Sequence, residues 1–221
     1  MLFFIIAVAA VVLGGQDFQP ILDRTRRIEI PGVTVLPPQS DNWFLFAVSA
    51  KEAVPATALI RLVQRLQDAQ PVKPQDARLV LANVIVQDSG EARAPAPAEF
   101  LEGFKREFVQ DGKIRLGEMI TPRQRLMGFD AALDDSLGAT CVRYNRVTEI
   151  TGQFPAFPSL VAISSTRGLF CSHPHWPQYN INVTFQQIYA KGQEPLARDA
   201  ESDGFLKGVV FTPAQPTPVP K

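Results

Sequence analysis

The sequence predicts an α+β fold, with a mainly antiparallel sheet and one or two helices packed on a face. Several short segments are rich in β-branched and aromatic residues, whereas only one segment shows clear helical periodicity. The 19 prolines and 14 glycines interrupt the chain often, which favours strands and loops over a helix bundle. With 221 residues, 46% of them hydrophobic, the chain is long enough to bury the core of one domain.

The first strands are expected in residues 28–35 and 43–48, where apolar and aromatic side chains predominate. Residues 58–66 fit either one helical face or a strand, and we favour the strand. Residues 78–86 predict a strand whose apolar residues shift from odd-numbered to even-numbered positions. This shift indicates burial on both faces or a bulge. These segments should form one side of the sheet.

The clearest helix is expected at residues 98–110, because Phe100, Phe104 and Phe108 fall on one helical face. Gly112 follows where a C-terminal cap belongs. This aromatic stripe predicts a helix that packs on the sheet. Further short strands are expected at residues 114–119, 140–150, 160–164, 168–172 and 179–190.

The chain divides into four parts. Residues 1–15 are expected to be a signal peptide or a short membrane anchor, and residues 16–27 a polar lead-in. Residues 28–192 should form a single α+β domain. Residues 193–221 are rich in proline near their end and are expected to form an extended C-terminal tail.

The N-terminal apolar run, residues 2–13, favours export. As a helix it would span roughly 18 Å, which is short of the ~30 Å hydrocarbon core and suits the apolar region of a signal peptide. The first basic residues, Arg24, Arg26 and Arg27, follow the run, and this position counts against export because the positive-inside rule would hold them in the cytoplasm. The short apolar run outweighs this signal, and we expect a location that is periplasmic, or membrane-associated on the periplasmic side.

Charge and motifs exclude several classes of function. The 22 basic and 22 acidic residues cancel, and no basic stripe is interleaved with aromatics, so we expect no nucleic-acid partner. The sequence has no glycine-rich phosphate loop, no His-Glu-x-x-His and no Gly-x-Ser-x-Gly. The pair Asp134-Asp135 is interpreted as a solvated turn. No catalytic residues and no cofactor are predicted.

The two cysteines, Cys141 and Cys171, both lie in apolar segments that resemble strands. Adjacent strands could place them opposite one another, and an exported protein with two cysteines favours a disulfide. Two buried free thiols are the alternative if the chain stays in a reducing compartment.

A metal site is a further alternative, because Cys171, His173 and His175 alternate and could project to one side of an extended segment. Pro174 and Pro177 instead indicate that a strand ends there in a turn. We therefore favour an exposed hairpin loop over residues 173–178. Its candidate partner-binding residues are His173, His175, Trp176 and Tyr179.

The segment Gly168-Leu169-Phe170-Cys171-Ser172-His173-Pro174 and the alternating segment at residues 181–185 resemble a group of uncharacterised exported bacterial proteins. Those proteins carry a Gly-x-x-Cys-x-His-Pro segment before a final strand. The resemblance implies an envelope location and a Cys141–Cys171 pair, and it implies nothing catalytic. The order of predicted strands and helix is also similar to the PsbP-like fold.

The function expected from these observations is that of an exported bacterial envelope protein without enzymatic activity. It would act as a binding module or an accessory subunit of a membrane-associated complex, with a protein partner in the envelope. One alternative is a metal-binding envelope protein that uses Cys171, His173 and His175. The other is a small-ligand-binding domain or a hydrolase whose site is assembled from scattered residues.

Overall fold

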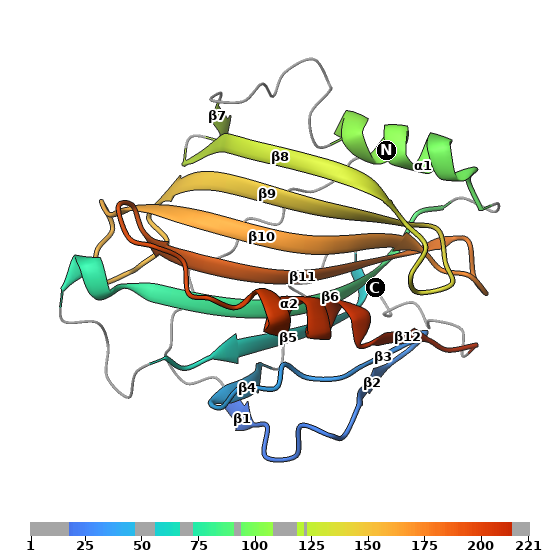
Figure 1. The fold of residues 1–221 in the computed structure, drawn as a ribbon, viewed down its shortest axis with the longest axis horizontal. Helices are drawn as coiled ribbons and strands as arrows, with labels where there is room; N and C mark the ends of the chain where they lie inside the picture. Colours follow the sequence, from blue (N-terminus) through green and yellow to red (C-terminus); the bar gives the residue numbers. More distant parts are fainter. Residues whose placement is uncertain are drawn as a thin grey trace.

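The structure, a computed structural model, describes residues 18–46, 56–66, 73–90, 94–107, 119–121 and 123–213 (Figure 1). Its main sheet is antiparallel and has nine strands. Their order is β1 (Phe18–Pro20), β4 (Trp43–Phe46), β5 (Ala56–Gln64), β6 (Arg78–Asp88), β11 (Tyr179–Ala190), β10 (Val161–Ser172), β9 (Cys141–Thr151), β8 (Gln124–Asp134) and β7 (Met119–Thr121). The α+β class and the mainly antiparallel sheet are confirmed.

One face of the main sheet is covered by helix α2 and by a small second sheet (Figure 1). Phe205 and Leu206 of the helix are buried against Phe185 of β11, and Val33 and Val35 of the small sheet join the same core. This is the largest of the hydrophobic clusters in the described residues. The covering elements are α2 (Asp199–Lys207), β2 (Ile28–Ile30), β3 (Val33–Val35) and β12 (Val209–Phe211).

The opposite face of the main sheet is covered in part by helix α1 (Pro97–Lys105). Phe100 stacks on Phe170 at 5.3 Å between ring centroids, and Phe104 lies 5.1 Å from the ring of Tyr144. The predicted aromatic stripe therefore packs on the sheet as expected, although Phe108 and Gly112 lie outside the described residues. A single 3-10 turn, η1 (Pro74–Asp76), precedes β6.

The observed strands differ from the predicted ones in two places. Residues 160–164 and 168–172 belong to one long strand, β10, because Gly168 continues the ladder instead of breaking it. Strand β8 was not predicted, since its small and charged residues give a weak apolar pattern. The ambiguous residues 58–66 form most of β5, as favoured, and pair with β6.

The expectation of an extended tail over residues 193–221 is wrong for its first part. Helix α2 and strand β12 lie there, because Phe205, Leu206 and Val209 bury their side chains in the core. Phe211 pairs with Val33, so this stretch does form a ladder. Residues 214–221 lie outside the described residues.

The N-terminal expectations are tested only in part. Within the lead-in, β1 pairs with β4, so the main sheet begins before residue 28. Residues 1–17, which contain the apolar run, lie outside the described residues, and the signal peptide or anchor stays a prediction. In the part of the chain that the structure describes, no helix combines the length and the apolar character needed to cross a membrane.

Helix α2 is fixed to the main sheet by a carboxylate as well as by its apolar face. Glu201 accepts hydrogen bonds from the backbone and hydroxyl of Ser40 and, at 3.2 Å, from the indole nitrogen of Trp43. Arg198, which directly precedes the helix, pairs with Glu201 at 2.8 Å. These bonds hold the helix in the position from which its other side chains reach strands β9 and β10.

Candidate functional site

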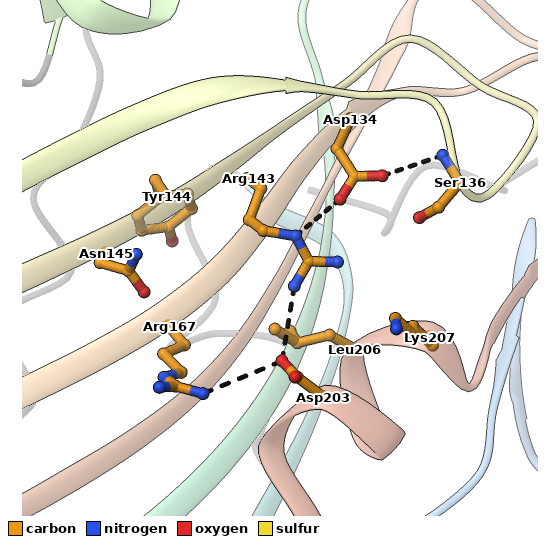
Figure 2. A pocket seen from close by; sticks show the side chains of 9 residues that line it. All are labelled: Asp134, Ser136, Arg143, Tyr144, Asn145, Arg167, Asp203, Leu206 and Lys207. Carbon is orange, nitrogen blue, oxygen red and sulfur yellow. Dashed lines mark hydrogen bonds and ion pairs between the residues drawn. The ribbon is translucent and has the colours of Figure 1, made fainter. Parts of the chain in front are cut away.

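A groove of about 500 Å³ lies between helix α2 and the strands β8, β9 and β10 (Figure 2). We call it the arginine groove. Its lining residues come from the strands, from the turn after β8 and from α2. They are Asp134, Ser136, Arg143, Tyr144, Asn145, Arg167, Asp203, Leu206 and Lys207.

Two arginines from neighbouring strands face the same side of the sheet. Arg143 of β9 pairs in register with Leu169 of β10, and Arg167 of β10 pairs with Asn145 of β9. Because side chains alternate along a strand, Arg143 and Arg167 both point toward α2. The strand register therefore directs both guanidinium groups into the groove, on either side of Asp203 (Figure 2).

Aspartates surround these guanidinium groups. Nε of Arg143 donates to Oδ2 of Asp134 at 2.6 Å, and Nη2 of Arg167 lies 2.9 Å from Oδ1 of Asp199. Asp203 lies between the two arginines, 3.6 Å from Nη1 of Arg143 and 3.9 Å from Nη1 of Arg167 (Figure 2). These last two distances are longer than a hydrogen bond, so the Asp203 carboxylate is held only by charge.

Asp134 is the acidic partner that the groove holds most firmly. Partial burial raises the pKa of its carboxyl, but hydrogen bonds from Ser136 and Arg143 outweigh that effect and leave the pKa below its ordinary value. Asp134 is therefore ionised at neutral pH and fixes the Arg143 side chain through Nε. The Nη atoms of Arg143 are left to face the groove.

The arginine groove carries N–H donors that can hold an oxyanion, because a planar guanidinium can bind a carboxylate or a phosphate. Asp134, Asp199 and Asp203 balance the cations of the groove, so an incoming anion must displace one of these carboxylates. The strands and α2 contribute Arg143, Arg167 and Lys207 for this purpose. None of the lining residues is a histidine or a cysteine, so the groove holds no group that ordinarily titrates near neutral pH.

Sequence reasoning missed these residues. Arg143 and Arg167 lie in segments interpreted only as strands, and nothing local shows that the two strands are neighbours. Asp199, Asp203 and Lys207 recur every fourth residue and would lie on one face of a helix. That spacing is a helical signal, although it lies in residues 193–221, which the proline content predicts to be an extended tail.

The predicted pair Cys141 and Cys171 forms a disulfide. The two residues are directly opposite in the β9–β10 ladder, with 4.0 Å between their Cα atoms, and both are buried. The alternative of two free thiols is therefore wrong. The metal alternative loses Cys171 as a ligand, because the metal-binding form of cysteine is a thiolate.

His173 is not on an exposed loop, and this expectation is wrong. Its side chain is fully buried, and Nε2 lies 2.8 Å from the carbonyl oxygen of Gly32, which can only accept a hydrogen bond. Nδ1 accepts the backbone N–H groups of His175 and Trp176 at 3.1 and 3.2 Å. Both ring nitrogens are thus occupied in the neutral tautomer, so His173 cannot ligate a metal. In the described residues, no cluster of three His, Cys, Asp or Glu side chains could hold one.

The other predicted contact residues differ in their exposure to solvent. Tyr179 is buried, so it cannot contact a partner directly. His175 is exposed and Trp176 is half-buried, with its indole nitrogen donating to the carbonyl oxygen of Pro213 at 3.0 Å. Partner binding by His175 and Trp176 stays a prediction.

The burial of His173 predicts a pH-dependent stability. Burial lowers the pKa of His173 and outweighs the opposite effect of the Gly32 hydrogen bond, and the nearby His175 lowers it further. The neutral form is favoured in the folded state, so its stabilisation is complete above the unfolded pKa of about 6.5 and is lost as the pH falls below it. Urea unfolding should show a lower free energy of unfolding at pH 5 than at pH 7.5.

The variant His173→Gln is the control for this effect. Glutamine keeps a donor and an acceptor but does not titrate, so the drop in stability between pH 7.5 and pH 5 should become smaller. His175→Gln should leave the drop almost unchanged, because His175 is exposed. Equal drops in the wild type and in His173→Gln would contradict the assignment.

Comparison with known proteins identifies no family. No family model matches the chain, and no curated protein matches its sequence. Among solved structures, the chain is similar to LpqN, described as involved in cell envelope biogenesis of Mycobacterium tuberculosis. The TM-score is 0.44 and the identity 13%, over 85% of this chain and 90% of that chain. Neither a shared function nor a shared family follows at this level, and the resemblances to the Gly-x-x-Cys-x-His-Pro group and to the PsbP-like fold stay predictions.

Proposed function

We propose that this chain is an exported bacterial envelope protein that acts as a binding module, and that the arginine groove holds an acidic group of a protein partner. The observation that carries the proposal is the pair of guanidinium groups from Arg143 and Arg167 on neighbouring strands. The lining residues support a role in recognition, because they present cations that ion pairs with aspartates hold in place.

The disulfide supports the proposed compartment. Disulfides persist in oxidising compartments such as the bacterial periplasm and are rare in the cytosol. Cys141 and Cys171 lie inside the core, where the sheet register brings them together. The N-terminal apolar run of residues 2–13 supplies the expected route of export.

The mode of binding follows from the geometry of Asp203. This carboxylate lies beside both guanidinium groups at distances longer than hydrogen bonds, so an incoming carboxylate can displace it at little cost. The displaced Asp203 is half-exposed and would turn to water. An acidic side chain of a partner would then form direct, bidentate bonds with Arg143 or Arg167.

A labelled hexaglutamate peptide tests the groove. The double variant Arg143→Gln/Arg167→Gln should weaken binding by at least about tenfold, because hydrogen bonds to charged groups contribute roughly 1.5–3 kcal/mol each. Lys207→Gln, which leaves the aspartate pairs intact, should weaken it less. Fluorescence anisotropy at low and high salt measures both effects, and binding should fall as salt increases.

The matched control removes two exposed cations elsewhere, Lys105→Gln/Lys191→Gln. It has the same net charge as the double groove variant and should bind like the wild type. Equal weakening in both double variants would show binding to the overall field, and the groove would lose its proposed role.

The compartment is tested by intact mass spectrometry of protein from the native periplasmic fraction. The protein should show two reactive thiols only after reduction.

A further inference from the structure

The face of the sheet opposite the arginine groove carries rows of polar side chains where a covered face is ordinarily apolar. Arg61, Asn83, Thr184, Gly168 and Tyr144 occupy paired positions on five successive strands. The next row contains Gln186 of β11, Thr166 of β10 and Arg146 of β9. We call these two rows, with the adjoining Ser164 and Asn182, the polar band.

Much of the polar band is buried and joined by hydrogen bonds. Nε of Arg61 donates to Oδ1 of Asn83 at 3.0 Å, and Nδ2 of Asn83 donates to Oγ1 of Thr184 at 3.2 Å. Gln186 donates to Oγ of Ser164 at 2.7 Å. Asn83, Gln186 and Ser164 are all less than one-tenth exposed. Burying polar side chains costs free energy that apolar residues would avoid, so the band calls for an explanation other than packing.

Tyr144 borders the arginine groove, but its ring lies on the opposite face of the sheet, where it forms the floor of the band together with Gly168. A Cβ atom on Gly168 would lie 2.3 Å from Cζ of Tyr144, so only glycine lets the tyrosine ring lie across strand β10. The ring thereby reaches β11, where its hydroxyl donates to Oδ1 of Asn182 at 3.0 Å. Burial raises the pKa of Tyr144, so the phenol keeps its proton.

One buried hydroxyl of the band lacks a partner. Thr166 is 3% exposed, and its Oγ1 has no hydrogen-bond partner among the residues that the structure describes. Its neighbours in the row are Gln186 and Arg146, so Oγ1 lies on the same face as their side chains. A buried polar atom without a partner indicates a place for a ligand or a bound water.

The strand positions on this face carry arginines but no carboxylates. In β5, β6, β11, β10 and β9, the described positions that face this side include Arg61 and Arg146 but no aspartate or glutamate. Apolar clusters flank the band on both sides. One contains Phe104 and Phe170, and the other contains Ile188.

We propose that the polar band is a second binding site, separate from the arginine groove, for a small organic molecule that carries a phosphate or carboxylate group. Arg146 binds the anionic group, and Thr166 and Gln186 beside it supply hydrogen bonds to the same group. Asn83 and Thr184 hold the polar remainder of the molecule. The flanking clusters accommodate an apolar chain if the ligand has one.

Titration calorimetry on the whole chain tests this site with glycerol 3-phosphate and dodecyl phosphate. At least one of them should bind, and Arg146→Gln and Thr166→Val should each weaken binding about tenfold. Arg125→Gln, an exposed arginine directed to the other face, should bind like the wild type. Tighter binding of dodecyl phosphate would identify a lipid-like ligand, and equal binding would identify a small phosphate ester.

Thermal unfolding of Thr166→Val provides a second readout. Because the substitution removes a buried hydroxyl without a partner, the melting temperature should rise while ligand affinity falls. Absence of binding of both phosphates to the wild type would overturn the proposal. So would unchanged affinity in Arg146→Gln together with a lower melting temperature in Thr166→Val, which would assign the band a purely structural role.

Discussion

Gly168→Ala should destabilise the protein by about 3 kcal/mol, the upper part of the range for overpacking a core. The added methyl group would lie 2.3 Å from Cζ and 2.4 Å from Cε1 of Tyr144. The ring cannot retreat, because it is buried and lies 5.1 Å from Phe104. For a domain of this size the melting temperature should fall by about 6–12 °C.

Gly204→Ala is the matched control. Gly204 lies in α2, and a Cβ atom there would meet nothing within 4 Å. Alanine should therefore stabilise the protein by roughly 0.5–1 kcal/mol through helix propensity. The double variant Gly168→Ala/Tyr144→Val should be more stable than the sum of its single changes predicts, since valine leaves room for the methyl group. Additive effects would show that the tyrosine ring is not the obstacle.

Replacing both cysteines by alanine should cost about 3.6 kcal/mol in the chain-entropy model for a loop of 30 residues. The melting temperature should fall by about 7–14 °C. Alanine is preferred to serine because both positions are buried, and a hydroxyl there would be desolvated. Differential scanning calorimetry of the oxidised wild type and the double variant measures the difference.

Reduction of the wild type separates the bond from the side chains. Reduction removes only the covalent link and keeps both cysteine side chains. The reduced protein should therefore lose most of the stability that the double alanine variant loses. The far-ultraviolet circular dichroism should stay close to that of the oxidised form, since the β9–β10 ladder also has its own hydrogen bonds. A reduced wild type as stable as the oxidised form would contradict the entropic origin of the effect.

Most strands could be predicted because burial on one or both faces leaves a pattern of apolar residues. Residues 78–86 are almost continuously apolar and residues 179–190 alternate apolar and polar side chains, and both form long central strands. Strand β8 could not be found in this way. Only one of its eleven residues is buried, so its sequence lacks an apolar pattern, and pairing with β9 and β7 defines the strand.

The residues around Cys171 show how local chemistry can mislead. A cysteine and two histidines at alternate positions suggested either a metal site or an exposed loop. In the structure, Cys171 is bonded to Cys141 and His173 is buried against Gly32, a residue 141 positions away. The burial of His173 depends on the small second sheet, which no local pattern around the histidine indicates.

The sequence by itself determined the α+β class, the aromatic helix that packs on the sheet and the candidate disulfide. The fold class and the helix follow from periodicity within short segments, and the candidate disulfide follows from the presence of two cysteines in a chain expected to be exported. Only the tertiary structure decided which strands are neighbours. That order sets Arg143 beside Arg167 in the groove, and it aligns Arg146, Thr166 and Gln186 on the other face. Strand pairing depends on contacts between residues far apart in the chain, so neither site has a local signature.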